Sequence, residues 1–544
     1  MIGVITNHSE ELAVREFFEL FKTPWEFYRA DGDYDVVLCT QTKNELIVNC
    51  KLIILFNSKK TIFDQQNKIE ILNSYNNELV NYFGNIFPVY GEIISFEGFS
   101  NNLININGKN ASIGFEISRE RTKIIRVGYN IFEEISFLLR SGQPAHLAEY
   151  PTLDLHIATL RKLIVSTGVP LIEIPPIPEG HEFIVCLTHD VDFVRLSRHR
   201  FDHTMFGFFY RAVWGSFRDF FKKRLPLKKL LTNFKAAVLL PGVYLGVVKD
   251  YFHQFDNYLK IEQDLPSTFF IMPFSQAPGR DDTGRLYHAR ASRYDISDIA
   301  DDVKRLVSSG KEVGLHGIDA WKDSHAGREE LQRISRESTS ADVGVRMHWL
   351  YFNDKSPRVL DEAGFVYDST SGYNEAVGFR AGSTQAFRPL EAKNLIELPM
   401  HIMDTALFYP GRMNLDENTA MRKIDQTIKS VKEHGGVLTI NWHQRSIGPE
   451  RLWDDHYRNL LKLLKKCNVW FATALYAACW FKTRRDISFE HVNICADKAH
   501  IKLSGIENRH LPAMFLRMYL PAQGEVRTVD VRFAGSLDAT LSLN

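Results

Sequence analysis

Acidic, basic and imidazole side chains follow several apolar, strand-like runs in the second half of the sequence. The run FIVCL continues into THDVD, which places Asp190 and Asp192 two positions apart. Four more such side chains lie in the runs EVGLHG, GVRMHW, FVYDST and VLTINWHQ: His316, Arg346, Asp368 and His443. A carboxylate and an imidazole can hold a divalent ion, a second carboxylate can act as a general base, and a histidine can act as an acid. These residues therefore form the inventory of metal-assisted hydrolysis.

This chemistry requires the side chains to meet, and the surrounding pattern predicts a fold in which they do. From about residue 181, strand-like runs alternate with helical stretches such as DIADDVKRLVSSG, which predicts parallel strands in a barrel-like or doubly wound sheet. In such sheets, reactive groups collect at the carboxyl ends of the strands. Asp190 and Asp192 lie on one strand face, whereas His189 points to the other face and is expected to be structural.

The ordered motifs between residues 181 and 483 resemble those of the NodB-homology polysaccharide deacetylases, carbohydrate esterase family four. THDVD is similar to the family's strand end with two aspartates, STFFIMP to its A-T-F-F strand, EVGLHG to its E-[IV]-G-x-H strand, and LTINWHQ to its final L-x-H strand. The phrases RMHWLYF, YDST, GFRAGS and FATALYAACWFKTR look like a bacterial branch that acts on cell-surface glycans. The resemblance implies a distorted (β/α) barrel of the polysaccharide deacetylase type.

The resemblance also implies a role for each motif residue. It makes Asp190 the general base, Asp192 and His316 ligands of a divalent metal such as zinc, Arg346 the residue that holds Asp190, His443 the acid, and Asp368 a candidate for the aspartate that orients this histidine. The implied reaction removes an N-acyl group, acetyl or formyl, from an amino sugar of a cell-surface glycan. A lipid- or nucleotide-linked precursor is a further candidate substrate, because no export signal is visible and residues 205–249 are basic and aromatic. Arg380 and Asp404 are further candidates, for substrate contacts.

The sequence departs from the family at one metal ligand. The family usually supplies a second histidine four residues after the first, but position 320 is alanine here. Asp319, His325 or His348 could complete the ligand shell, and the spacing does not choose among them. Because a catalytic zinc site normally has three protein ligands plus water, the alternative hypothesis is a catalytically impaired glycan-binding protein with the deacetylase fold.

Other regions flank or interrupt this domain. Residues 1–150 are expected to form an N-terminal α/β module of unknown role, the proline-rich residues 151–180 a linker, and residues 484–544 a small β module. An insertion at 200–250 is dense in Phe, Tyr, Trp, Lys and Arg. One interpretation is helices packed on the main domain. The other is an interfacial helix pair over residues 205–249, with aromatic side chains at headgroup level and lysines facing anionic lipid.

The composition narrows the function classes. A chain of 544 residues is long enough for two or three domains. Its 66 Lys and Arg balance 66 Asp and Glu, which argues against a globally basic nucleic-acid binder. The partner that the family resemblance implies is a carbohydrate. Six scattered cysteines without a CxxC spacing, no visible secretory signal and no apolar run of spanning length are typical of a cytoplasmic protein, here either free or at the inner membrane face.

Overall fold

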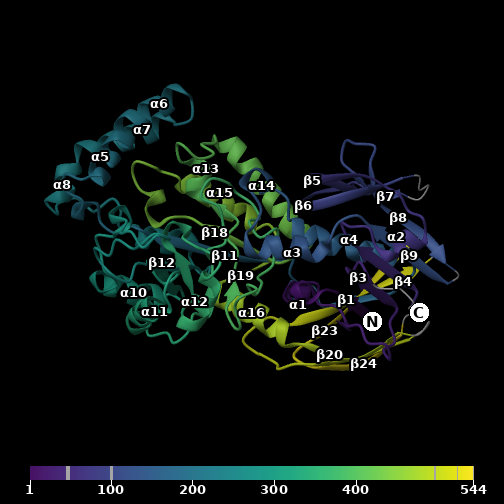
Figure 1. Ribbon diagram of the computed structural model, residues 1–544. Helices are drawn as coiled ribbons and strands as arrows, with labels where there is room; N and C mark the ends of the chain where they lie inside the picture. Colours follow the sequence, from purple (N-terminus) through teal and green to yellow (C-terminus); the bar gives the residue numbers. More distant parts are fainter. Residues whose placement is uncertain (44–48, 98–101, 120, 495–497, 523–524, 543–544) are drawn as a thin grey trace. The chain divides into compact units, whose positions relative to one another are not determined.

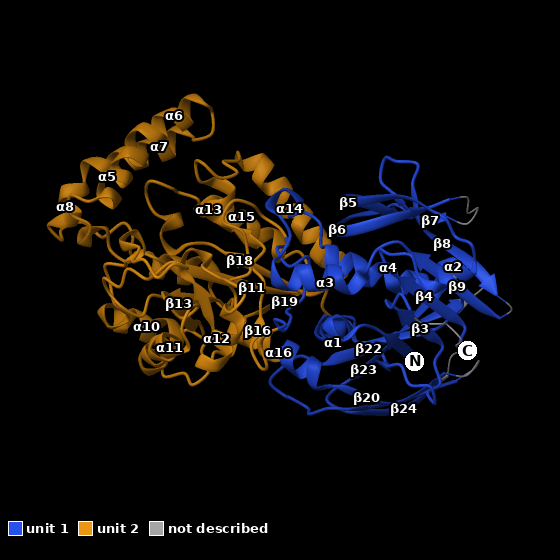
Figure 2. Ribbon diagram, in the orientation of Figure 1, with its two compact units in different colours: residues 1–179, 379–390, 480–544 blue, residues 180–378, 391–479 orange. Residues whose placement is uncertain are grey.

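The chain forms two compact units, each with its own sheets (Figures 1 and 2). The computed structural model describes residues 1–43, 49–97, 102–119, 121–494, 498–522 and 525–542. Unit 1 consists of residues 1–179, 379–390 and 480–544, and unit 2 consists of residues 180–378 and 391–479.

The sheet of unit 2 is built around β11 (Phe183–Val191), the strand that carries the THDVD motif. Its strands lie in the order β16-β15-β14-β13-β12-β11-β18-β17, β19 also pairs with β11, and every pairing is parallel. The neighbours are β12 (Thr268–Ile271), β13 (Glu312–Gly317), β14 (Val345–Met347), β15 (Tyr367–Asp368), β16 (Ile396–Glu397), β17 (Ile402–Met403), β18 (Val437–Asn441) and β19 (Val469–Ala472). The predicted parallel α/β sheet is therefore confirmed, and all nine residues of β11 are buried, as expected for a strand covered on both faces.

Helices connect these strands, because parallel neighbours need a crossover between them. They are α9 (Phe255–Glu262), α10 (Ala300–Ser308), α11 (Ser324–Ser338), α12 (Ser356–Ala363), α13 (Asp404–Phe408), α14 (Glu417–His434) and α15 (Asp454–Leu464). In α14, the buried side chains Ala420, Ile424, Ile428 and Val431 recur at helical spacing and form one apolar stripe. The Asp416 carboxylate caps this helix by accepting from the Thr419 backbone N–H at 3.0 Å.

The insertion of unit 2 is helical. It contains α5 (His203–Tyr210), a π-helical turn (Arg211–Gly215), α6 (Ser216–Phe221), α7 (Leu227–Val238) and α8 (Leu240–Tyr244). These elements, together the helical arm, lie at one edge of unit 2 (Figure 1). None of the helices in the described ranges is both long and apolar enough to cross a bilayer.

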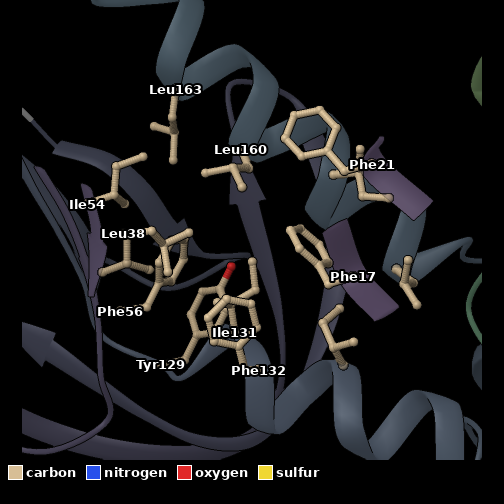
Figure 3. Close-up of a cluster of buried hydrophobic side chains, with 14 of the residues drawn as sticks. Phe17, Phe21, Leu38, Ile54, Phe56, Tyr129, Ile131, Phe132, Leu160 and Leu163 are labelled. Atoms are coloured by element: carbon tan, nitrogen blue, oxygen red, sulfur yellow. The ribbon is translucent and has the colours of Figure 1, made fainter. Parts of the chain in front are cut away.

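The large sheet of unit 1 has a parallel half and an antiparallel half. The parallel half contains β2 (Trp25–Phe27), β1 (Ile2–Ile5), β3 (Val36–Cys39), β4 (Leu52–Phe56) and β9 (Thr122–Val127). The antiparallel half continues with β8 (Ser112–Arg119), β6 (Asn85–Phe96), β5 (Ile71–Tyr82) and β7 (Asn102–Ile106). Figure 3 shows the core between strands β3 and β4 and the helices α1 (Glu11–Phe21), α3 (Ile131–Arg140) and α4 (Thr152–Ser166).

The boundaries of unit 1 differ from those expected from the sequence. Residues 151–180 are not a linker, because α4 buries Leu153, Ile157 and Leu160 in the core and β10 (Leu171–Glu173) pairs with β22 (Met514–Ala522). That pairing also joins part of the C-terminal β region to unit 1. Cys39, Cys50 and Cys186 are buried free thiols, and Cys495 lies outside the described residues.

Candidate active site

The first part of the site is a buried carboxylate held from two sides. Asp190 is the second-last residue of β11. Its Oδ1 accepts from the Arg346 guanidinium at 3.0 Å, and its Oδ2 accepts from the Asn441 side-chain amide at 2.7 Å. Burial alone would raise the pKa of Asp190, but the charge of Arg346 and the nearby imidazoles hold this pKa below its ordinary value. Asp190 is therefore an ionised carboxylate with a fixed orientation.

Arg346, on β14, is fully buried and fixed by its other contacts. Its guanidinium donates to the Thr188 hydroxyl at 2.7 Å and to the Ser369 hydroxyl and backbone carbonyl at 2.8 and 2.9 Å. The same group lies over the ring of Phe270, 4.5 Å from its centre. A buried arginine with this many partners has little freedom to turn, so it can hold Asp190 in place as expected.

The second part of the site is a cluster of three potential metal ligands. One ligand atom each from Asp192, His316 and His348 lies within 4.8 Å of the other two. His316 Nε2 is 3.1 Å and His348 Nε2 is 3.5 Å from the same oxygen of Asp192. Burial lowers the pKa of His348 to about 3, so this imidazole is neutral and offers a lone pair.

The orientation of His316 also fits a metal ligand. Its Nδ1 lies 3.0 Å from the backbone carbonyl of Arg346. The proton therefore belongs on Nδ1, which donates to the carbonyl, and the lone pair of Nε2 faces Asp192. A backbone acceptor of this kind is how proteins commonly fix a metal-binding imidazole.

Of the three candidates for a third ligand, His348 is the one that lies in this cluster. Strands β13 and β14 pair so that His316 lies beside Arg346, and the chain turns directly after Met347, which brings the His348 ring to 4.9 Å from the His316 ring. The other two candidates lie elsewhere. The Asp319 carboxylate accepts from the Arg280 backbone N–H at 2.7 Å, and His325 is exposed on α11.

The third part of the site is an imidazole paired with a buried aspartate. His443 follows β18, and its Nδ1 lies 2.6 Å from Asp404 Oδ1, while its backbone N–H donates to the other Asp404 oxygen at 2.9 Å. Its Nε2 is 3.8 Å from Asp192. Burial would lower the pKa of His443, but the charge of Asp404 outweighs it and the pKa is raised above 6.5. This histidine is poised to hold a proton on the side that faces the metal-ligand cluster.

Asp368 does not take the expected place beside His443. It lies on β15, whereas β18 is on the far side of β11 in the same sheet, and its carboxylate accepts from the Thr370 hydroxyl. Burial raises the pKa of Asp368 to about 6 and that of the adjacent Glu397 well above its ordinary value, as expected for two buried carboxyls side by side. The aspartate that orients His443 is Asp404, which the sequence suggested only for substrate contacts.

Asp404 reaches His443 because of a strand pairing that is too short to recognise in the sequence. Strand β17 has two residues and pairs with β18, so that Met403 lies opposite Asn441. The residues that follow, Asp404 and His443, then emerge together. The motifs also do not predict a role for Asn441, which holds Asp190, although its position in the NWH phrase is a signal that could identify it.

These groups open into one cleft of about 1580 Å³. Its walls include Asp190, Asp192, His316, His348 and His443, together with aromatic and arginine side chains such as Phe193, Trp349, Tyr409, Arg412 and Arg445. Trp349 has a left-handed backbone, with φ of 63°, and its ring is 43% exposed next to His348. The five polar side chains that the motifs nominated or left open thus meet at one mouth, and Arg346 lies behind them.

Comparison with known proteins gives matches among solved structures. A putative polysaccharide deacetylase from Mycobacterium smegmatis is 19% identical over 57% of this chain and 95% of that chain, with a TM-score of 0.37. Puue allantoinase is 14% identical over 57% and 94%, with a TM-score of 0.35. A putative polysaccharide deacetylase involved in O-antigen biosynthesis from Bordetella bronchiseptica is 12% identical over 56% and 91%, with a TM-score of 0.24. No family model and no curated protein sequence matches the chain.

Proposed function

We propose that unit 2 is a metal-dependent hydrolase that removes an N-acyl group, acetyl or formyl, from an amino sugar of a cell-surface glycan or of its lipid- or nucleotide-linked precursor. One observation carries the proposal: an ionised Asp190 and a proton-holding His443 lie around the cluster of Asp192, His316 and His348. Amide hydrolysis needs a base for the attacking water and an acid for the departing amine. The choice of an amino sugar as the substrate rests on the resemblance of the motifs to those of the polysaccharide deacetylases.

The three clustered side chains suit a zinc-like ion. They offer one carboxylate oxygen and two imidazole nitrogens, which is a donor set of catalytic zinc sites that keep one position open. When bound, such an ion supplies polarisation of the acyl carbonyl and lowers the pKa of water. Burial opposes the ionisation of Asp192, but the charge of the nearby His443 helps to hold its pKa well below the ordinary value, so it offers a carboxylate oxygen.

The remaining residues move the protons. Asp190 accepts a proton from the attacking water as the new C–O bond forms, with Arg346 and Asn441 holding its two oxygens in place. His443 donates its Nε2 proton to the nitrogen as the C–N bond breaks, and Asp404 stabilises the imidazolium before that transfer. The products are a carboxylic acid and a free amine, and the proton on Asp190 replaces the one lost from His443.

The position of His348 bears on the alternative of an impaired glycan-binding protein. That alternative rested on Ala320, which stands where the family usually has its second histidine. Since His348 lies beside His316 and Asp192, the substitution at Ala320 does not leave the cluster with only two ligands. We therefore favour an active hydrolase.

The proposal is tested with purified protein and N-acetyl and N-formyl amino-sugar glycosides, by measuring released acetate or formate. Chelator treatment should stop the release and added Zn²⁺ should restore it. His348→Ala should require much more Zn²⁺ for the same rate, whereas the matched control His325→Ala should behave as the wild type. Turnover that survives complete metal removal, or equal behaviour of the two variants, would contradict the proposal.

A further inference from the structure

The helical arm of unit 2 and the residues directly before and after it carry most of the exposed large apolar side chains in the described part of the chain. More than half of those side chains lie between residues 201 and 247. On the run α5–α6 they are Phe206, Phe209, Tyr210, Trp214, Phe217 and Phe221. On α7 and the segment after it they are Leu227, Leu231, Val238, Leu239, Leu245 and Val247. An exposed apolar surface on this scale is typical of a site that binds another surface.

The exposed side chains recur at helical spacing on both helical runs. Steps of three or four residues separate Phe206, Tyr210, Trp214 and Phe217, so these rings line one face of the first run. Leu227, Leu231 and Val238, at steps of four and seven residues, line one face of α7. Phe217 contacts Phe234 of α7 with ring centres 4.7 Å apart, which joins the two stripes into one surface.

The opposite face of the arm is already used for packing. Phe208 and Ala212 on the first run, and Ala236, Ala237 and Leu240 on the second, are buried in a small core with Leu196 and Phe252. The arm therefore has its own folded interior. Its exposed stripe is a second apolar face that is not part of this interior.

The charge of this region limits what can cover the stripe. Between residues 200 and 249 there are ten Lys and Arg and two Asp, a net charge of +8 in a chain whose total is zero. Lys222, Lys223 and Lys228 are exposed, and no carboxylate pairs with any of them among the described residues. A second copy of the arm would bring like charges together, whereas an anionic surface would compensate them.

We propose that the helical arm docks unit 2 in the plane of an anionic lipid surface, with the aromatic stripe at headgroup level and the lysines paired with lipid phosphates. Aromatic and aliphatic side chains beside clustered lysines are the composition of interfacial helices. The arm begins at the cleft, since His203 and Thr204 of α5 are among the residues that line it. Docking would hold the cleft close to headgroups. It goes beyond the proposed hydrolysis and does not depend on it.

The test is sedimentation of the full chain with phosphatidylcholine vesicles that do or do not contain phosphatidylglycerol. Binding should require phosphatidylglycerol and should weaken at high salt. Neutralising three lysines, in Lys222→Gln/Lys223→Gln/Lys228→Gln, should lower the partition coefficient about 100-fold, because each basic side chain near an anionic surface contributes about fivefold. Phe206→Ser/Trp214→Ser should lower it about tenfold or more, through lost apolar burial.

Matched control variants distinguish binding through the stripe from nonspecific binding of exposed apolar or charged side chains to vesicles. Phe83→Ser removes a ring that is 62% exposed on unit 1, and Lys304→Gln/Lys355→Gln/Lys429→Gln removes three exposed charges of unit 2 outside the arm. Both should bind vesicles as the wild type does. Tryptophan fluorescence should shift to shorter wavelength with vesicles, and Trp214→Phe should lose this shift while keeping the binding.

Three results would overturn the proposal. The first is equal binding to vesicles with and without phosphatidylglycerol. The second is a loss of binding in the controls that matches the loss in the arm variants. The third is that the protein does not bind vesicles but forms an oligomer, and that Phe206→Ser/Trp214→Ser dissociates this oligomer. The stripe would then be a contact between copies of the chain. Circular dichroism should show the same helix content in every variant, because the substituted side chains are exposed.

Discussion

Imidazole and carboxylate side chains lie at both faces of strand β11, but they have different roles at the two faces. On one face, His189 is fully buried between the Trp442 carbonyl, 2.7 Å from its Nδ1, and the Glu262 carboxylate, 2.7 Å from its Nε2. Glu262 also accepts from the Tyr457 hydroxyl at 2.6 Å and lies 3.4 Å from the Lys311 ammonium. Every charge on this face is compensated within the core, so the cluster is structural, as the strand alternation predicts.

The other face of β11 contains the proposed active site. Asp190 and Asp192 project there with His316, His348 and His443, and all five side chains line one cleft. The types of residue on the two faces do not distinguish them. The difference lies in whether neighbouring elements complete the hydrogen bonding or leave atoms directed at open space, which is why the comparison can be tested by changing one face at a time.

The largest expected effect is on the open face. Asp190→Asn should lower kcat about 1000-fold or more, because an amide cannot accept the proton of the attacking water. The amide keeps an oxygen that can accept from Arg346, so the melting temperature should change little. The measurement is acetate release alongside a thermal melt. A variant that keeps the wild-type rate would mean that the base is another residue.

On the closed face, the expected effect is on stability. Glu262→Ala should lower the free energy of unfolding by about 3 kcal/mol, because it leaves Lys311 and His189 buried without their carboxylate. Denaturant unfolding measures this, and kcat per folded molecule should stay near the wild-type value. Loss of turnover without loss of stability would mean that this face is part of the catalytic site.

The stability of the closed face should also depend on pH. Burial opposes ionisation of Glu262, but the charges of His189 and Lys311 outweigh it and hold its pKa below the usual 4.5. Stabilisation by this group is then complete above pH 4.5 and is lost as the pH falls through the lower, folded-state pKa. The difference in unfolding free energy between wild type and Glu262→Gln should shrink in that acidic range. A difference that grows on acidification would contradict this assignment.

A smaller effect separates the two aspartates that compete for the role beside His443. Asp404→Asn should lower kcat about 100-fold with unchanged metal content, because the amide cannot stabilise the imidazolium. Asp368→Asn should leave kcat within a few-fold of the wild type, since its neighbours are Thr370 and Glu397. Steady-state kinetics of the two variants decide between them, and the reverse ranking would restore the expectation from the sequence.

Much of unit 2 can be predicted because its signals are local. An apolar run that ends in acids marks β11, and the strand-end rule places Asp190, Asp192, His316 and His443 at one mouth. Contacts between segments that are far apart in the sequence cannot be predicted in this way. His348 becomes a neighbour of His316 through the β13–β14 register, and Asp404 reaches His443 through a two-residue strand that carries no recognisable pattern.

The boundaries of unit 1 fail for a related reason. Prolines near residues 170–178 suggest a joint between domains, but the apolar face of α4 just before them packs into the core of unit 1. The buried Arg484 also donates to the carbonyls of Leu20 and Ile174, at 3.0 and 2.6 Å. Neither contact can be recognised from the local composition. The sequence therefore does not reveal that these distant segments belong to one unit.

The most direct test of the central claim is an anomalous-difference map from crystals of the protein soaked with Zn²⁺. We predict one peak bonded to Asp192, His316 and His348 at about 2.0–2.2 Å, with Asp190 and His443 facing it. A map without a peak at saturating Zn²⁺, or with the ion bound by other residues, would contradict the account.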